Sequence, residues 1–175
     1  PIEPLKIEED VIPLPGQQRP KEEELTGFEK SEEKAVKSIQ KHSMLIDGLE
    51  RNSQIDEAYL LLGKSRYYLQ RFVPALEAFT FGIENYPNAN LYRETKIWKA
   101  KTHVRLQNEE LAIETLKTVL RSPELSEAEY EKAHTAMAMA FTQLDSVDRV
   151  IEHLKKSTLY FEDSNQGARN LFILG

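Results

Sequence analysis

Apolar residues recur along most of the chain at the three- and four-residue spacing of helices that bury one face. This spacing predicts one helix over residues 28–52 and helix pairs over 56–89, 93–126 and 131–164. The apolar face of the first helix consists of Ala35, Val36, Ile39, Leu45, Ile46 and Leu49. Because no stretch shows the strict alternation of a half-buried strand, the pattern predicts an all-α chain.

The three predicted pairs share a register of small and apolar residues. In the first pair, Ala75 follows Gly63 by twelve residues, and Phe79 lies one helical turn beyond Ala75. The corresponding residues of the later pairs are Ala100, Ala112 and Leu116, then Ala138, Val150 and Leu154. The small residues at 63, 100, 138 and 175 are spaced by 37, 38 and 37 residues. We expect Gly63, Ala100, Ala138 and Gly175 each to lie where two helices approach most closely.

The stretch from Tyr59 to Pro87 carries the spacing of a tetratricopeptide (TPR) repeat: an aromatic residue, two residues, Leu-Gly, then Ala-x3-Phe, then Pro. It predicts a TPR superhelix of antiparallel helix pairs. The usual TPR period is about 34 residues, so each unit here carries three or four more. One position departs from the pattern, because Arg66 stands where a Tyr is expected.

Helix start and stop residues set the predicted boundaries. Ser or Thr three residues before Glu, as in Thr26–Glu29 and Ser126–Glu129, is typical of a capping box. In the third unit, the second helix is expected over about 148–161, with a turn at 163–167. The predicted organisation is a flexible or extended, acidic, Pro-rich leader over 1–27, an N-terminal capping helix over 28–52, TPR units over 56–89, 93–126 and 131–164, and the start of a truncated fourth unit over 167–175.

The leader holds five of the eight prolines, and such a segment buries too little apolar surface to offset its ordering entropy. An alternative is that its apolar residues Ile7, Val11, Ile12 and Leu14 dock on the array or on a partner. The chain begins without Met and stops eight residues into a fourth unit, which predicts a piece of a longer protein.

Composition narrows the function classes. A net charge of −6 argues against non-specific nucleic-acid binding, which needs a basic face. The absence of Cys excludes a disulfide framework and thiolate chemistry. No apolar run approaches the roughly 20 residues that span a bilayer.

The residue patterns of common active sites are missing as well. The four histidines lack the His-x3-His spacing of a helical metal site, and there is no Gly-rich phosphate loop or nucleophile elbow. We therefore expect no catalytic residue, cofactor or metal. A helical-repeat enzyme domain stays as an alternative, which an ordered metal or a buried pair of catalytic carboxylates would favour.

Protein binding is the better-founded hypothesis. In stacked helical repeats the first helices line the concave wall, and their positions two, five, nine, twelve and thirteen share one stripe. This stripe comprises Glu57, Leu60, Lys64, Tyr67 and Tyr68, then Glu94, Ile97, Lys101, Val104 and Arg105, then Lys132, Thr135, Met139, Thr142 and Gln143. The candidate partner-binding residues are the aromatic and cationic ones: Lys64, Tyr67, Tyr68, Lys101 and Arg105. The alternative for Tyr67 and Tyr68 is packing between units.

The run DEAYLLLGKSRYYLQRFVPALEAFTFGIENYP, with KSIQKHSM before it and KIWKAKT…NEELAIETLK after it, resembles the TPR lipoprotein of the type IX secretion and gliding-motility machinery of Bacteroidetes. The likeness covers roughly 34–117, and QRFVPALEAF is its most distinctive part.

This resemblance implies a periplasmic, outer-membrane-associated protein without catalysis, which connects the outer-membrane translocon to ring or motor components. The implied partners are proteins, and the implied membrane contact runs only through a lipid anchor that this sequence does not contain. The alternative is a generic TPR adaptor for another complex.

Overall fold

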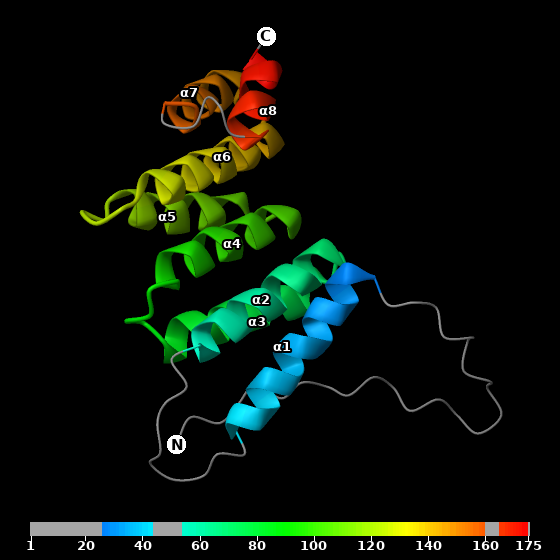
Figure 1. Ribbon diagram of the computed structural model, residues 1–175. Coiled ribbons are helices and arrows are strands. Elements are labelled where there is room, and N and C mark those ends of the chain that lie inside the picture. Colours follow the sequence, from blue (N-terminus) through cyan, green and yellow to red (C-terminus); the bar gives the residue numbers. More distant parts are fainter. Residues whose placement is uncertain (1–25, 44–53, 160–164, 175) are drawn as a thin grey trace, which may run out of the picture. The chain divides into compact units, whose positions relative to one another are not determined.

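All secondary structure in the described part of the chain is helical (Figure 1). The computed structural model describes residues 26–43, 54–159 and 165–174. Its helices are α1 (Gly27–Ser43), α2 (Ile55–Tyr68), α3 (Phe72–Asn85), α4 (Tyr92–Arg105), α5 (Glu109–Leu120), α6 (Glu127–Gln143), α7 (Val147–Ser157) and α8 (Asn165–Leu174). This arrangement confirms an all-α fold for the described residues, and it is compatible with a helical repeat.

The chain divides into two compact units, Pro1–Asn85 and Tyr86–Gly175, and each is described by itself. In the first unit, α2 packs against both α1 and α3. In the second, α4, α5 and α6 pack on one another, α7 packs on α6, and α8 packs on α7.

The same turn joins the two helices of each hairpin, α2–α3, α4–α5 and α6–α7. Its central residue has a left-handed backbone, with φ of 62° at Gln70, 59° at Gln107 and 52° at Asp145. In every turn, the next residue donates its backbone N–H to the carbonyl five residues back, as Arg71 does to Arg66 at 2.9 Å. This is a Schellman motif. The three turns lie 37 and 38 residues apart, so the backbone repeats with the same period as the sequence.

Gly63 lies in close contact with a side chain of α3, as predicted. A Cβ atom added to Gly63 would come within 2.6 Å of Cδ1 and Cζ of Phe79, and closer still to Cε1. The Phe79 ring is fully buried, so it fills the space that the missing side chain leaves. Ala100 and Ala138 are also buried, and Gly175 lies outside the described residues.

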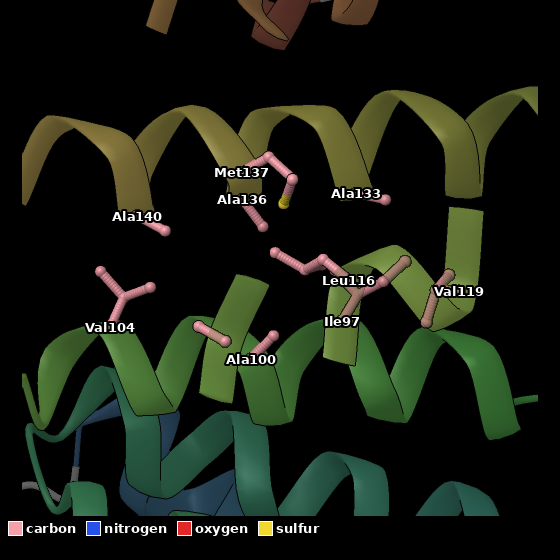
Figure 2. Close-up of a cluster of buried hydrophobic side chains, with 10 residues drawn as sticks. Ile97, Ala100, Val104, Leu116, Val119, Ala133, Ala136, Met137 and Ala140 are labelled. Atoms are coloured by element: carbon pink, nitrogen blue, oxygen red, sulfur yellow. The ribbon is translucent and has the colours of Figure 1, made fainter. Parts of the chain in front are cut away.

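The core of the second unit lies between α4, α5 and α6 (Figure 2). Ile97, Ala100 and Val104 of α4 face Ala133, Ala136 and Ala140 of α6 across a layer of buried side chains. Leu116 and Val119 of α5 complete this layer. The many alanines of α6 allow α4 and α6 to approach closely. Each methylene buried in this layer contributes about 0.8 kcal/mol to the stability of the fold.

Both predicted capping boxes are confirmed. Thr26 donates its backbone N–H to Glu29 at 2.7 Å, and Glu29 returns its own N–H to the Thr26 hydroxyl at 3.3 Å. Ser126 and Glu129 repeat this exchange at 3.0 and 3.3 Å. These reciprocal bonds satisfy backbone donors that have no partner within the helix.

Two predicted boundaries near the C-terminus are wrong. Helix α7 ends at Ser157 instead of continuing to about 161, because the hydroxyls of Ser157 and Thr158 bond to the carbonyls of Leu154 and Lys155 and compete with the helical ladder. Residues 165–167, expected in a turn, form the start of α8, where a Gly in the first turn is tolerated. The predicted leader up to residue 25 and the predicted helix beyond residue 43 lie outside the described residues.

Candidate partner-binding surface

The first unit carries an aromatic cluster, formed by Phe28, Tyr67, Tyr68 and Phe72. Phe28 of α1 stacks on Tyr68 of α2, with ring centroids 4.7 Å apart and an interplanar angle of 15°. Tyr67 meets Tyr68 edge-on at 5.7 Å and Phe72 at 5.5 Å. Phe28 and Tyr68 remain 45% and 51% exposed. Such ring pairs are worth about 0.5–1.5 kcal/mol beyond their buried area, so the exposed rings are held in place before any partner arrives.

The Schellman turn at Gln70 explains why these rings meet. It ends α2 directly after the two tyrosines and starts α3 at Phe72. Phe28 reaches them from the first turn of α1, which the Thr26 capping box fixes.

An ion-pair triad of Glu32, Arg66 and Arg71 lies at the same end of the hairpin. Glu32 of α1 accepts a hydrogen bond from Nε of Arg66 at 2.9 Å and another from Nη1 of Arg71 at 3.2 Å. Arg66, which is buried, also donates to the backbone carbonyl of Pro74 at 3.2 Å. The residue that departs from the TPR pattern therefore ties α1, α2 and α3 together. A buried charge needs such partners, since its desolvation is otherwise unfavourable by several kcal/mol.

The five predicted partner-binding residues fall into two groups, one in each unit. Tyr67 and Tyr68 lie together in the aromatic cluster, and Lys64, one turn earlier on α2, is half-buried. In the second unit, Nζ of Lys101 lies 4.7 Å from the centre of the Trp98 ring, and Arg105 ends α4 with an exposed side chain.

The predicted stripe does not form one exposed surface. Leu60 and Ile97 are only 4% and 1% exposed, and Val104 and Thr135 are buried as well. Ile97 and Val104 belong to the core that α6 covers. Helical periodicity identifies the residues that share one face of a helix, but it does not show whether another helix covers that face, as α6 covers Ile97 and Val104.

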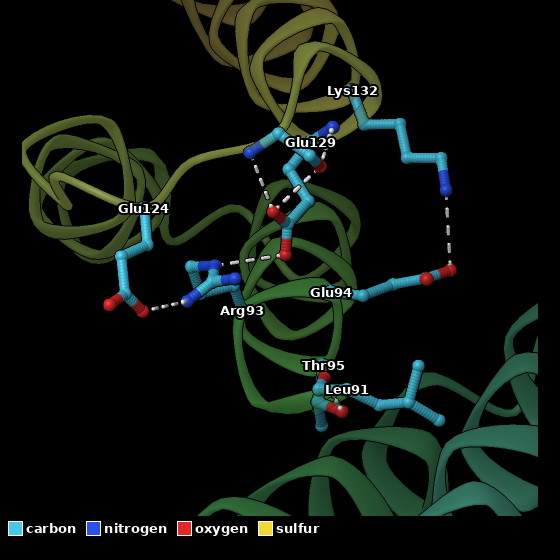
Figure 3. Close-up of polar contacts among 8 residues, drawn as sticks. Leu91, Arg93, Glu94, Thr95, Glu124, Glu129 and Lys132 are labelled. Carbon is cyan, nitrogen blue, oxygen red and sulfur yellow. Dashed lines mark hydrogen bonds and ion pairs between the residues drawn. The ribbon is translucent and has the colours of Figure 1, made fainter. Parts of the chain in front are cut away.

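Polar contacts hold α4 and α6 in register (Figure 3). Glu129, the capping residue of α6, accepts a hydrogen bond from Nε of Arg93 at 3.0 Å, and Lys132 lies 3.5 Å from Glu94. Burial alone would raise the pKa of Glu129. The hydrogen bonds from Ser126 and the charge of Arg93 outweigh it and lower the pKa below its usual value. Arg93 also approaches Glu124 at 4.0 Å.

Neither metal-site nor membrane-span geometry is found within the described residues. No cluster of three or more His, Cys, Asp or Glu side chains is arranged to hold a metal ion there, and no described helix has the length and apolarity that crossing a bilayer requires.

The sequence reasoning missed Phe28 and Phe72 as parts of the aromatic cluster, and it missed the partners of Arg66. The Glu32–Arg66 separation of 34 residues gives no local signal, because it depends on how α1 packs on α2. Compared with known proteins, the chain matches no protein-family description, and no curated protein is significantly similar to it.

Proposed function

We propose that this chain is a TPR-type scaffold that binds protein partners and has no catalytic role. The observation that carries the proposal is the aromatic cluster, in which half-exposed rings are fixed on three packed helices. Tyrosines are over-represented among the residues that dominate binding energies at protein interfaces, since they bring large contact area at a small loss of conformational entropy. In the triad, Arg66 and Arg71 share the single carboxylate of Glu32, so this end of the hairpin keeps positive charge that favours an acidic partner segment.

The repeated hairpins support the TPR assignment. Three hairpins with the same turn recur at 37 and 38 residues, and Gly63, Ala75 and Phe79 occupy the packed positions that the TPR pattern expects. Stacked repeats of this kind present extended surfaces to their binding partners.

We further propose that the scaffold works in the type IX secretion and gliding-motility apparatus, in the periplasm and at the outer membrane. There it would link the translocon to ring or motor components. The support is the resemblance of residues 34–117, including QRFVPALEAF, to the TPR lipoprotein of that machinery. A TPR adaptor for another multiprotein complex is the second candidate, and the same aromatic cluster favours it equally.

Photo-crosslinking from the aromatic cluster tests the binding role. A photoreactive phenylalanine replaces Tyr68, and the matched control carries it at Glu77, an exposed residue of α3. We expect crosslinks from position 68 to envelope proteins of the secretion apparatus and few from position 77. Crosslinks only to cytosolic proteins would refute the role in secretion and favour the second candidate, an adaptor for another complex. Equal labelling from both positions would refute the aromatic cluster as the contact surface.

Charge reversal tests the cationic residues separately. Lys64→Glu combined with Lys101→Glu is expected to weaken partner binding while the helical circular dichroism signal is unchanged, because neither side chain belongs to the buried core. Unchanged binding would exclude these two residues from the contact.

A further inference from the structure

Two histidines meet inside the α6–α7 hairpin of the second unit. Nδ1 of His134 lies 2.7 Å from Nδ1 of His153, and the two rings stack with centroids 4.9 Å apart. The side chains are only 4% and 7% exposed. Tyr130 packs on the His134 ring at 4.3 Å, and Phe141 stacks on the His153 ring at 5.4 Å. The pair is therefore enclosed by aromatic rings, with little access to water.

The separation of the two nitrogens fixes how many protons the pair can hold. At 2.7 Å one Nδ1 must donate and the other must accept, so two neutral rings of opposite tautomer satisfy the contact. A first added proton leaves the bond intact but places a charge in a buried site. A second proton removes the acceptor, and two N–H groups then face each other at a distance that only hydrogen bonding allows. The doubly protonated pair must separate.

The charges that act on the pair come from α7. Burial, followed by the neighbouring His153 and Lys156, lowers the pKa of His134 to about 4, although Glu152 opposes them. Burial also lowers the pKa of His153, against the effect of Glu152 and with help from Lys156 and Arg149. On α6, the ring of Tyr130 packs on His134. Among the described residues of α4, α5 and α8, the other helices packed on this hairpin, no charge shifts either imidazole.

We propose that the His134–His153 pair makes the α6–α7 hairpin an acid-responsive joint, which is closed while both rings are neutral and opens when the pair takes up protons. Because α8 packs on α7, and Asn170 of α8 hydrogen-bonds to Thr135 and Ser157 at 3.0 and 2.8 Å, opening also loosens α8. This inference is independent of the proposed scaffold function.

The direction and size of the response follow from proton linkage. The open form binds protons with the ordinary histidine pKa of about 6.5, whereas the closed form resists them, so acid favours opening. The closed hairpin is fully stable above that value and loses stability as the pH falls from about 6.5 toward 4. For His134 alone, a closed-state pKa of about 4 raises the opening equilibrium constant about 20-fold between pH 7 and pH 5.

Hydrogen exchange of backbone amides tests the proposal in the full chain. Protection factors, corrected for intrinsic exchange at each pH, are compared at pH 7 and pH 5. We expect those of α7 to fall by more than the roughly 20-fold that His134 alone would give, because His153 contributes as well. The variant His134→Phe with His153→Leu keeps an apolar filling and has no titrating group, and its α7 protection should change less than threefold. His153→Asn, which can still hydrogen-bond to His134 but cannot take up a proton, should show a smaller fall than the unaltered chain.

The matched control is His103→Asn. His103 is another buried histidine of the second unit, on α4, and burial lowers its pKa too, so this variant should leave the fall at α7 intact. The proposal is overturned if α7 of the unaltered chain keeps its protection at pH 5. It is also overturned if the protection of α7 falls as far in the His134→Phe, His153→Leu variant as in the unaltered chain. If that double variant does not fold, the same result in His153→Asn overturns the proposal.

Discussion

Replacing Gly63 by Ala tests a close contact between α2 and α3 in the first unit. Two effects of opposite sign compete. Alanine is a better helix former than glycine by about 1 kcal/mol in a helix interior, so propensity alone favours the variant. The added methyl group, however, meets the buried ring of Phe79.

The geometry decides which effect is larger. Three ring carbons of Phe79 lie within 2.6 Å of the new Cβ, whereas carbon atoms pack best at about 3.5–4.0 Å. The ring must therefore move by about 1 Å, and it is completely buried, so no open space receives it. Overpacking of this kind costs about 1–3 kcal/mol, and three simultaneous overlaps place it near the upper end. Gly63→Ala should destabilise the chain by about 2 kcal/mol.

Urea denaturation followed by circular dichroism measures this change. Gly27→Ala is the matched control, since a Cβ at Gly27, the first residue of α1, meets no atom within 4 Å. This control should alter stability by no more than about 0.5 kcal/mol.

A double-mutant cycle isolates the contact itself. Phe79→Leu removes the ring atoms that the new methyl group would meet, so Gly63→Ala should be less harmful in that background. The destabilisation of the double variant should fall short of the sum of the singles by about 1 kcal/mol or more. If Gly63→Ala instead stabilises the chain, or if the two changes add, the close contact does not exist in solution.

Three further substitutions test other contacts, each by denaturation. Glu32→Gln leaves the buried Arg66 guanidinium without its carboxylate and should cost about 3 kcal/mol, whereas replacing both by Leu and Met should be nearly neutral. Gln107→Gly relieves a left-handed non-glycine residue and should stabilise by about 0.5–1 kcal/mol, and a loss of stability would show that the turn is not left-handed. Asn170→Leu removes two buried hydrogen bonds and should cost about 2 kcal/mol. It should also make α8 accessible to proteolysis. If α8 of this variant resists the protease, Asn170 does not hold α8 in place.

The helices were largely predictable because the information lies in local sequence. The spacing of Gly63, Ala75 and Phe79 indicated a hairpin, and both capping boxes follow from two residues three positions apart. The ends of α7 and α8 were less predictable, since short polar side chains such as Ser157 compete with the backbone for its hydrogen bonds in ways that periodicity does not reveal.

Contacts between helices account for most of what was missed. Periodicity placed Leu60 on an exposed stripe, yet packing buries it. Glu32 meets Arg66, and His134 meets His153, only because two helices pack at a particular rotation and register. Neither pair has a sequence spacing that a single helix would produce. The exposed stacking of Phe28 on Tyr68 arises in the same way.

The backbone conformation at Gln70, Gln107 and Asp145 tests the repeat most directly. Three-bond HN–Hα couplings and backbone chemical shifts from NMR report φ at each residue in solution. The account predicts a positive φ at all three residues, close to the 62°, 59° and 52° of the structure, and a negative φ at the residues on both sides of each. A negative φ at any one of them would contradict the repeating turn.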